Sequence, residues 1–186
     1  MNLPNRLTLL RLALVPLVII LIIINQPLCK WLALIVFGAA SLTDMLDGRL
    51  ARRNNQVTNL GKFLDPLADK ALVCSVLICF IAQGLASVIP VIIVVIREFL
   101  VSGIRLAAVD KGRVIAANKW GKAKTASQMI SITVVLFLQI LVSYSLISLE
   151  FVSIVSNTAV WITALLTAVS GYIYLRTNAD VLTESK

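Results

Sequence analysis

Four aspartates lie close together in an apolar part of the chain, at Asp44, Asp47, Asp65 and Asp69. The first two are three residues apart and the last two are four apart, so each pair would share one face of a helix. Four clustered carboxylates cannot all stay ionised without counter-charge, and two divalent cations would supply it. Hard oxygen ligands favour Mg²⁺ or Mn²⁺. The spacing therefore predicts a site for two divalent cations.

Small and basic residues stand between these acids. Gly48 and Ala51 leave room for a ligand, and Arg52 would place a guanidinium beside the expected metals, as recognition of a diphosphate requires. Carboxylates for metal and arginine for phosphate together predict phosphoryl transfer. Since the chain has no histidine, a general base must come from Asp, Glu, Lys, Tyr or Cys. Charged residues can also rest at a membrane interface without a role, but carboxylates there are costly and usually mark a function.

The elements that must position these residues are predicted to be membrane helices. The chain is 59% hydrophobic and only 14% charged, with a mean hydropathy of +0.95, which is far from the composition of a soluble domain. Continuous apolar runs long enough to cross a bilayer as helix occupy residues 7–25, 31–50, 62–82, 86–108, 125–148 and 151–175. We therefore expect an all-α integral membrane protein with six transmembrane helices, folded as a single domain over residues 1–186.

Lysine and arginine are distributed unevenly among the connections between these runs. Basic residues crowd the chain start and the second and fourth connections, whereas the other three connections are almost uncharged. The positive-inside rule then predicts that both termini, and the aspartates, face the cytoplasm. Asp65 and Asp69 are also expected to gain from the positive end of their helix dipole. The net charge of +8 indicates topology and attraction to anionic lipid, with nucleic-acid binding disfavoured because no soluble domain is expected.

The aspartate stretch resembles the signature of the CDP-alcohol phosphatidyltransferases. The matching residues are Asp44, Asp47, Gly48, Ala51, Arg52, Gly61, Asp65 and Asp69. The resemblance implies the six-helix CDP-alcohol phosphotransferase fold, a homodimer, and a multi-pass protein of the bacterial cytoplasmic membrane. It implies further that the four aspartates hold two divalent cations on the diphosphate of a CDP-linked lipid. Asp69 would be the general base that activates an acceptor hydroxyl, and CMP would leave.

Two further groups of residues are assigned to the CDP-lipid by the same resemblance. One lies in the signature region, at Gly48, Ala51, Arg52 and Thr58. The other lies in "PNRLTLLR", which is similar to the opening motif of the family and contains Asn5, Thr8 and Arg11. The second group steps by three residues and forms one polar stripe on an apolar helix. Simple anchoring of this stripe at the membrane interface is the alternative.

The acceptor site is predicted from basic residues farther along the chain. Arg97 and Glu98 fall halfway along the fourth expected span, so they must face protein or a wet cavity. We expect an anion pocket bordered by Arg97 and Arg105 and completed by Lys119, Lys122 or Lys124. The segments "REFLVSGIR" and "GKAKT" resemble the phosphatidylglycerophosphate synthase branch of the family, which implies glycerol 3-phosphate as acceptor and CDP-diacylglycerol as donor. The alternative is that Arg97 and Glu98 merely pair with polar groups inside the bundle.

Other functions remain open on the sequence alone. Within the family, the acceptor could be inositol phosphate, serine or phosphatidylglycerol. Outside it, an acidic cluster near a bilayer could serve a cation transporter, although the acids gather near one face with Arg52 instead of following a path across the bilayer. A purely structural membrane scaffold would leave the aspartate signature without a purpose.

Overall fold

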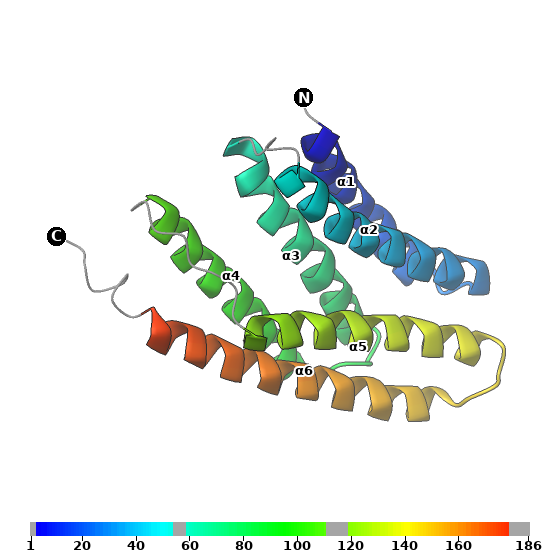
Figure 1. Ribbon diagram of the computed structural model, residues 1–186. Coiled ribbons are helices and arrows are strands. Elements are labelled where there is room, and N and C mark those ends of the chain that lie inside the picture. Colours follow the sequence, from blue (N-terminus) through cyan, green and yellow to red (C-terminus); the bar gives the residue numbers. More distant parts are fainter. Residues whose placement is uncertain (1–2, 54–58, 111–118, 179–186) are drawn as a thin grey trace.

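The computed structural model describes residues 3–53, 59–110 and 119–178, with side chains at 8–43, 67–106, 108 and 120–178. The described part contains six helices and no strand, which confirms the all-α expectation (Figure 1). The helices are α1 (Leu3–Ile23), α2 (Pro27–Arg53), α3 (Asn59–Ala82), α4 (Val88–Asp110), α5 (Lys119–Ser143) and α6 (Leu149–Thr177).

The helices pack as three consecutive hairpins around one hydrophobic core. Helix α1 lies against α2 and α3, α5 lies against α6 and α2, and α4 lies against α6 and α3. The core receives residues from all six helices, with Phe37, Phe80 and Ile132 among the most deeply buried. Figure 1 shows that the start of α1, the end of α2 and the start of α3 lie at the same end of the molecule. The folding therefore gathers the aspartate segments at one end.

The other end of the bundle, which we call the turn end, carries the three short connections 24–26, 83–87 and 144–148. Four hydrogen bonds link different hairpins there. Gln83 Nε2 donates to the Ile22 carbonyl at 2.9 Å, and Lys30 Nζ donates to the Gln139 carbonyl at 3.4 Å. The Ser87 N–H donates to Asn157 Oδ1 at 2.9 Å, and Ser153 Oγ donates to the Gly84 carbonyl at 3.0 Å. The three hairpins are thus joined to one another at their turns.

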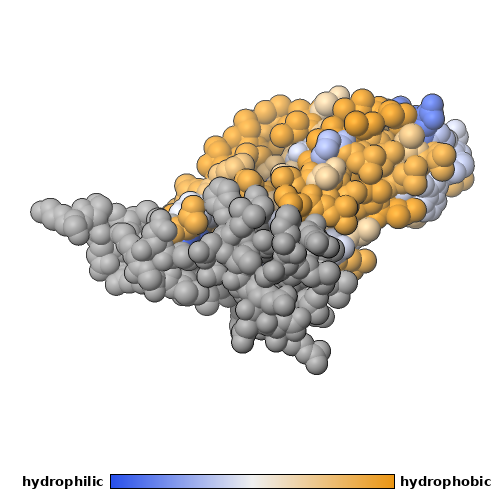
Figure 2. Space-filling model, turned by 90° about the horizontal axis from the view of Figure 1, so that it is seen from above, coloured by the Kyte–Doolittle hydropathy of each residue, from blue (hydrophilic) through white to orange (hydrophobic). Residues whose placement is uncertain are grey.

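The exterior of the described part is apolar while several polar side chains are inside. Large exposed residues such as Ile35, Ile92 and Leu165 cover its surface, and Figure 2 shows hydrophobic residues over most of the described face. The polar side chains buried inside include Arg11, Glu98, Lys124, Gln128, Thr163, Thr167 and Ser170. An apolar surface of this extent marks contact with another apolar phase, such as lipid or a partner protein.

Two described helices, Trp120–Ser143 and Leu149–Thr177, are long and apolar enough to cross a membrane by length and composition. The segments Thr8–Ile23 and Pro27–Thr43 are shorter apolar helices. The apolar runs thus coincide with helices, but the fifth helix differs from its expected span. It ends at Ser143 instead of continuing to 148, because residues 144–148 form a turn that hydropathy does not detect.

The ends of α3 and α5 are closed by the same hydrogen-bond pattern. Gly84 has φ +69°, and the N–H groups of Gly84 and Leu85 donate to the carbonyls of Ile81 and Phe80. This is a Schellman motif with glycine in the left-handed position. At the end of α5 the same position is occupied by Ser145, with φ 57°, where a side chain is sterically disfavoured.

Ser145→Gly is therefore expected to stabilise the fold by about 1 kcal/mol, because glycine adopts the left-handed conformation without steric cost. Thermal unfolding in detergent should show a raised midpoint. The same substitution at Ser143, the last residue of α5, should not raise it, since the backbone there is helical and glycine gains nothing from a left-handed conformation. A midpoint that is lowered by Ser145→Gly would contradict this account of the turn.

Candidate active site

The aspartate motif is divided between two consecutive helices. Asp44 and Asp47 lie in the last turns of α2, and Asp65 and Asp69 lie in α3. Of the four, only Asp69 has a described side chain, which is half-buried; the metal-ligand arrangement of Asp44, Asp47 and Asp65 falls outside the described side chains. No group of three metal-ligating side chains occurs among those that are described. The predicted metal site therefore remains a prediction.

The prediction that the dipole of α3 stabilises the carboxylates of Asp65 and Asp69 is wrong. The helix begins at Asn59, earlier than the apolar run suggested, and has no acidic residue in its first turn. Asp65 and Asp69 lie deeper in the helix, and the dipole effect falls off within the first turn. Residues 59–61, which include the polar Asn59, extend the helix beyond the part that hydropathy detects, so any charge compensation for these carboxylates must come from cations.

The N-terminal polar stripe points into the bundle. Thr8 and Arg11 are 1% and 2% exposed, and each has a polar interaction within the protein. Their helix, α1, packs against α2 and α3, the two helices that carry the aspartates. A residue that only anchors a helix at an interface would remain exposed, so the burial disfavours that alternative. Asn5 lies outside the described side chains, as do Gly48, Ala51, Arg52 and Thr58.

A cluster of charged side chains lies where α4, α5 and α6 meet; we call it the basic cluster and define it as Arg97, Glu98, Arg105 and Lys124. Glu98 and Lys124 are buried, Arg97 is half-buried and Arg105 is exposed. Lys124 Nζ forms an ion pair with Glu98 Oε1. Arg97 Nη1 lies 3.6 Å from the same oxygen. Glu98 and Lys124 are 7% and 4% exposed. Buried charges require partners, and here one carboxylate is shared by two cations.

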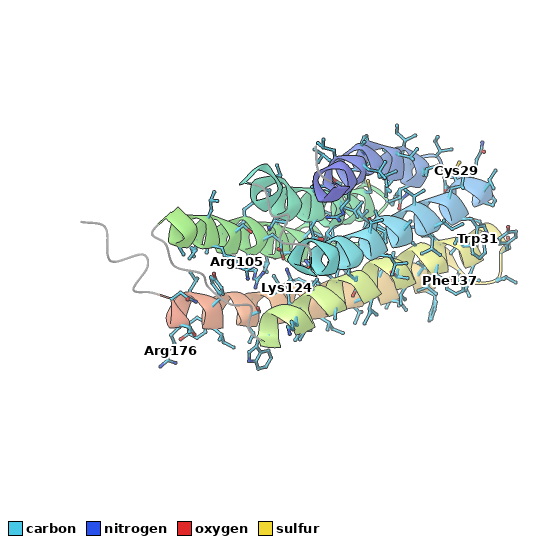
Figure 3. All side chains as sticks on the ribbon, turned by 45° about the horizontal axis from the view of Figure 1, so that its top comes forward. Cys29, Trp31, Arg105, Lys124, Phe137 and Arg176 are labelled. Carbon is cyan, nitrogen blue, oxygen red and sulfur yellow. The ribbon has the colours of Figure 1, made fainter. Side chains whose placement is uncertain are left out.

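Arg105 completes the cluster nearer the end of α4. Its guanidinium carbon lies 5.8 Å from the centre of the Tyr174 ring, which is within range of a cation–π contact. Figure 3 shows Arg105 on α4 and Lys124 on α5 toward the middle of the bundle, whereas Arg176 and Phe137 point away from it. The cluster therefore holds three cations and one carboxylate, an excess of two positive charges.

Two polar atoms in or beside the basic cluster have no hydrogen-bond partner within the described part of the chain; one belongs to Arg97 and the other to Tyr174, which contacts Arg105. Arg97 Nε and the Tyr174 hydroxyl are buried and have no hydrogen-bond partner among the described residues. Leaving a buried donor unsatisfied costs free energy. An anionic ligand at this place would satisfy both donors and the excess of positive charge.

The cluster also lies close to the end of the aspartate motif. Lys124 is within electrostatic range of Asp69, and Lys70 interacts electrostatically with Glu98, Asp69 and Arg105. The structure thus brings three of the predicted acceptor residues, Arg97, Arg105 and Lys124, into one cluster, of which Lys124 lies within electrostatic range of Asp69. It leaves Lys122 exposed on α5, outside this cluster, and Lys119 lies outside the described side chains.

A family model described as CDP-alcohol phosphatidyltransferase matches residues 1–174 of the chain. The chain belongs to the CDP-alcohol phosphatidyltransferase family. A family member from Bacillus subtilis (strain 168) is 39% identical over 99% of this chain and 98% of its own length. Members from Rickettsia bellii and Rickettsia typhi are each 37% identical over 94% of this chain, and over 94% and 96% of their own lengths. All three are named CDP-diacylglycerol--glycerol-3-phosphate 3-phosphatidyltransferase.

The structure of this chain adds residues to the candidate site that its sequence did not predict. Lys70 follows Asp69 directly, and α6 contributes Ser170, Gly171 and Tyr174 to the surroundings of Arg97 and Arg105. The α6 residues lie in a long apolar run, where serine, glycine and tyrosine are common packing residues. Their spacing places Ser170 and Tyr174 one turn apart on one face, which is the only sequence signal that could have found them.

Proposed function

We propose that this chain transfers the phosphatidyl group of CDP-diacylglycerol to sn-glycerol 3-phosphate, forming phosphatidylglycerophosphate and CMP. Its relatives carry the name of this reaction. The structural observation that supports the acceptor is the basic cluster, with its buried pair of Glu98 and Lys124, its excess of two positive charges and the unsatisfied Arg97 Nε. A phosphate monoester carries a charge close to −2 at neutral pH and offers several strong acceptor oxygens. Serine and phosphatidylglycerol lack such a group.

Asp69 is proposed as the general base. The basic cluster would hold the acceptor by its phosphate, within electrostatic range of the Asp69 carboxylate. Asp69 would then remove the proton from an acceptor hydroxyl, whose oxygen attacks the phosphorus on the lipid side of the diphosphate. The phosphorus–oxygen bond to CMP breaks, and CMP leaves. Positioning and charge supply most of the rate in such a reaction.

Two divalent cations, Mg²⁺ or Mn²⁺, are proposed for Asp44, Asp47, Asp65 and Asp69. The donor set fits these ions, since it consists of carboxylates on two consecutive helices at one end of the bundle. When bound, the cations would neutralise charge on the diphosphate. Among the chain's own residues, we assign Asn5, Thr8, Arg11, Gly48, Ala51, Arg52 and Thr58 to binding of the CDP-lipid. The burial of Thr8 and Arg11 against the aspartate-bearing helices supports this assignment.

We further propose that all six helices cross the bacterial cytoplasmic membrane as one domain, residues 1–186, with both termini and the active site on the cytoplasmic side. The apolar exterior and the common core of the six helices support this arrangement. The concentration of basic residues in alternate connections supports its orientation. A homodimer is also proposed, from the family resemblance; cross-linking in native membranes tests it.

The direct test is release of CMP by purified protein in detergent, with CDP-diacylglycerol and Mg²⁺ or Mn²⁺. We expect release only with glycerol 3-phosphate, and none after removal of divalent cations with a chelator. Parallel assays with inositol phosphate, serine and phosphatidylglycerol identify a different acceptor, and release with one of these would overturn the assignment. Metal flux into liposomes without CDP-lipid would instead support the transporter.

A further inference from the structure

Two neighbouring residues of α6, Ser170 and Gly171, contact the side chain of Arg97. Ser170 is completely buried, and its Oγ accepts a hydrogen bond of 2.9 Å from Arg97 Nη2. The neighbouring Gly171 is also buried. A Cβ atom at Gly171 would lie 2.9 Å from Arg97 Cγ, and 3.7 Å and 3.9 Å from its Nε and Cδ. The arginine stem therefore passes directly over the glycine.

These two contacts fix different parts of the same side chain. Gly171 fixes the path of the aliphatic stem, because Cγ lies near the backbone and cannot give way as the free end of a side chain would. Ser170 fixes one nitrogen of the guanidinium, while Glu98 Oε1 lies 3.6 Å from the other terminal nitrogen. With both terminal nitrogens engaged, Nε remains as the buried nitrogen without a protein partner. The guanidinium is thus held with one donor available for a ligand.

We infer that Ser170 and Gly171 are positioning residues that set the affinity for the phosphate-bearing acceptor by fixing the guanidinium of Arg97. This inference rests on the proposed function, since it takes the basic cluster as the acceptor site. It adds α6, which carries none of the predicted site residues, as the element that aligns the basic cluster. The contact between Arg105 and Tyr174 is a second connection from α6 to this cluster.

Gly171→Ala should raise the KM for glycerol 3-phosphate by about ten- to a hundredfold, because a displacement of about 1 Å at a binding group can cost that much. The KM for CDP-diacylglycerol should stay within about twofold of the wild-type value.

Ser170→Ala should raise the KM for glycerol 3-phosphate by about tenfold, the effect of losing one hydrogen bond to a charged group. The matched control is Gly38→Ala in α2, where an added Cβ meets nothing within 4 Å; its kinetic constants should equal those of the wild type.

A double-mutant cycle distinguishes positioning from a general structural effect. Arg97→Ala removes the stem that a Cβ at position 171 would strike. In that background Gly171→Ala should cause no further rise in the KM for glycerol 3-phosphate, whereas an independent packing effect would add to it. The affinity for glycerol 3-phosphate can be measured separately, from the rise of the thermal midpoint that the ligand causes. In Gly171→Ala and Ser170→Ala this rise should become smaller as the KM increases.

The outcomes separate this inference from the proposed function. If the wild type releases no CMP with glycerol 3-phosphate, the proposed function fails and this inference falls with it. If the wild type is active and Arg97→Ala raises the acceptor KM, but Gly171→Ala and Ser170→Ala leave it unchanged, only this inference is overturned. If Gly171→Ala does not yield a monodisperse protein, Ser170→Ala decides alone, because it removes one atom and adds no volume.

Discussion

Asp69→Asn is expected to lower the rate of CMP release by at least about a thousandfold, since a positioned general base contributes about 10²–10⁴-fold and the same carboxylate is proposed to hold a cation. The amide is nearly the same size, so the protein should still fold. Asp69 is half-buried in the middle of α3, within electrostatic range of Lys124. Single-turnover assays with saturating glycerol 3-phosphate and CDP-diacylglycerol measure the loss.

The control for this prediction is Glu150→Gln, which makes the same change from carboxylate to amide. Glu150 is exposed in the first turn of α6, at the turn end of the bundle. The Glu150→Gln variant should therefore release CMP at the wild-type rate. An Asp69→Asn variant that retained more than about a tenth of the wild-type rate would exclude Asp69 as the base, provided that the thermal midpoint is unchanged.

The second large effect is expected on stability. Lys124→Met should lower the free energy of unfolding by about 3 kcal/mol, because it leaves the buried Glu98 carboxylate without its closest partner. The loss should fall at the lower end of the usual range, since Arg97 Nη1 remains 3.6 Å from the same oxygen. Denaturant or thermal unfolding in detergent measures the change.

A matched control is available two residues away. Lys122 is exposed on α5, and Lys122→Met should change the free energy of unfolding by no more than about 0.5 kcal/mol. The double variant Glu98→Gln with Lys124→Met should be more stable than the sum of the single effects predicts, because it removes both charges of the pair. Strict additivity, or a Lys124→Met variant as stable as the wild type, would show that the ion pair does not support the fold.

The sequence was sufficient to predict the six helices of the described part and the family to which the chain belongs, whereas the chemistry of the site stays a prediction. Apolar runs of bilayer length define helices well, and the spacing of the four aspartates restricts their chemistry strongly. Helix boundaries were predicted less well. The turn at residues 144–148 interrupts an apolar run, and the start of α3 lies in a polar segment, so hydropathy misplaced both.

The contributions of α6 could not be predicted, because they depend on tertiary contacts. Nothing in the residue types of Ser170 and Gly171 indicates that Arg97, far away in the sequence, packs over them. The pairing of Lys124 with Glu98 is similar, since a cytoplasmic lysine is expected from topology alone. Whether such a residue is buried beside a carboxylate or exposed, as Lys122 is, depends on how α5 is rotated against its neighbours.

The hydrogen bonds that join the three hairpins at the turn end have a mechanical consequence. They act at a common pivot, and each helix extends from it as a lever. A helix of 25 residues, the length of α5, is about 37 Å long, so a rotation of about 3° at the turns would move its far end by about 2 Å. Groups close to the pivot barely move in such a rotation. The spacing between helices at the active-site end can therefore change by as much as the Lys124–Glu98 pair and the Arg97–Ser170 hydrogen bond allow, while the hydrogen bonds of Lys30, Gln83, Ser87 and Ser153 remain almost unstretched.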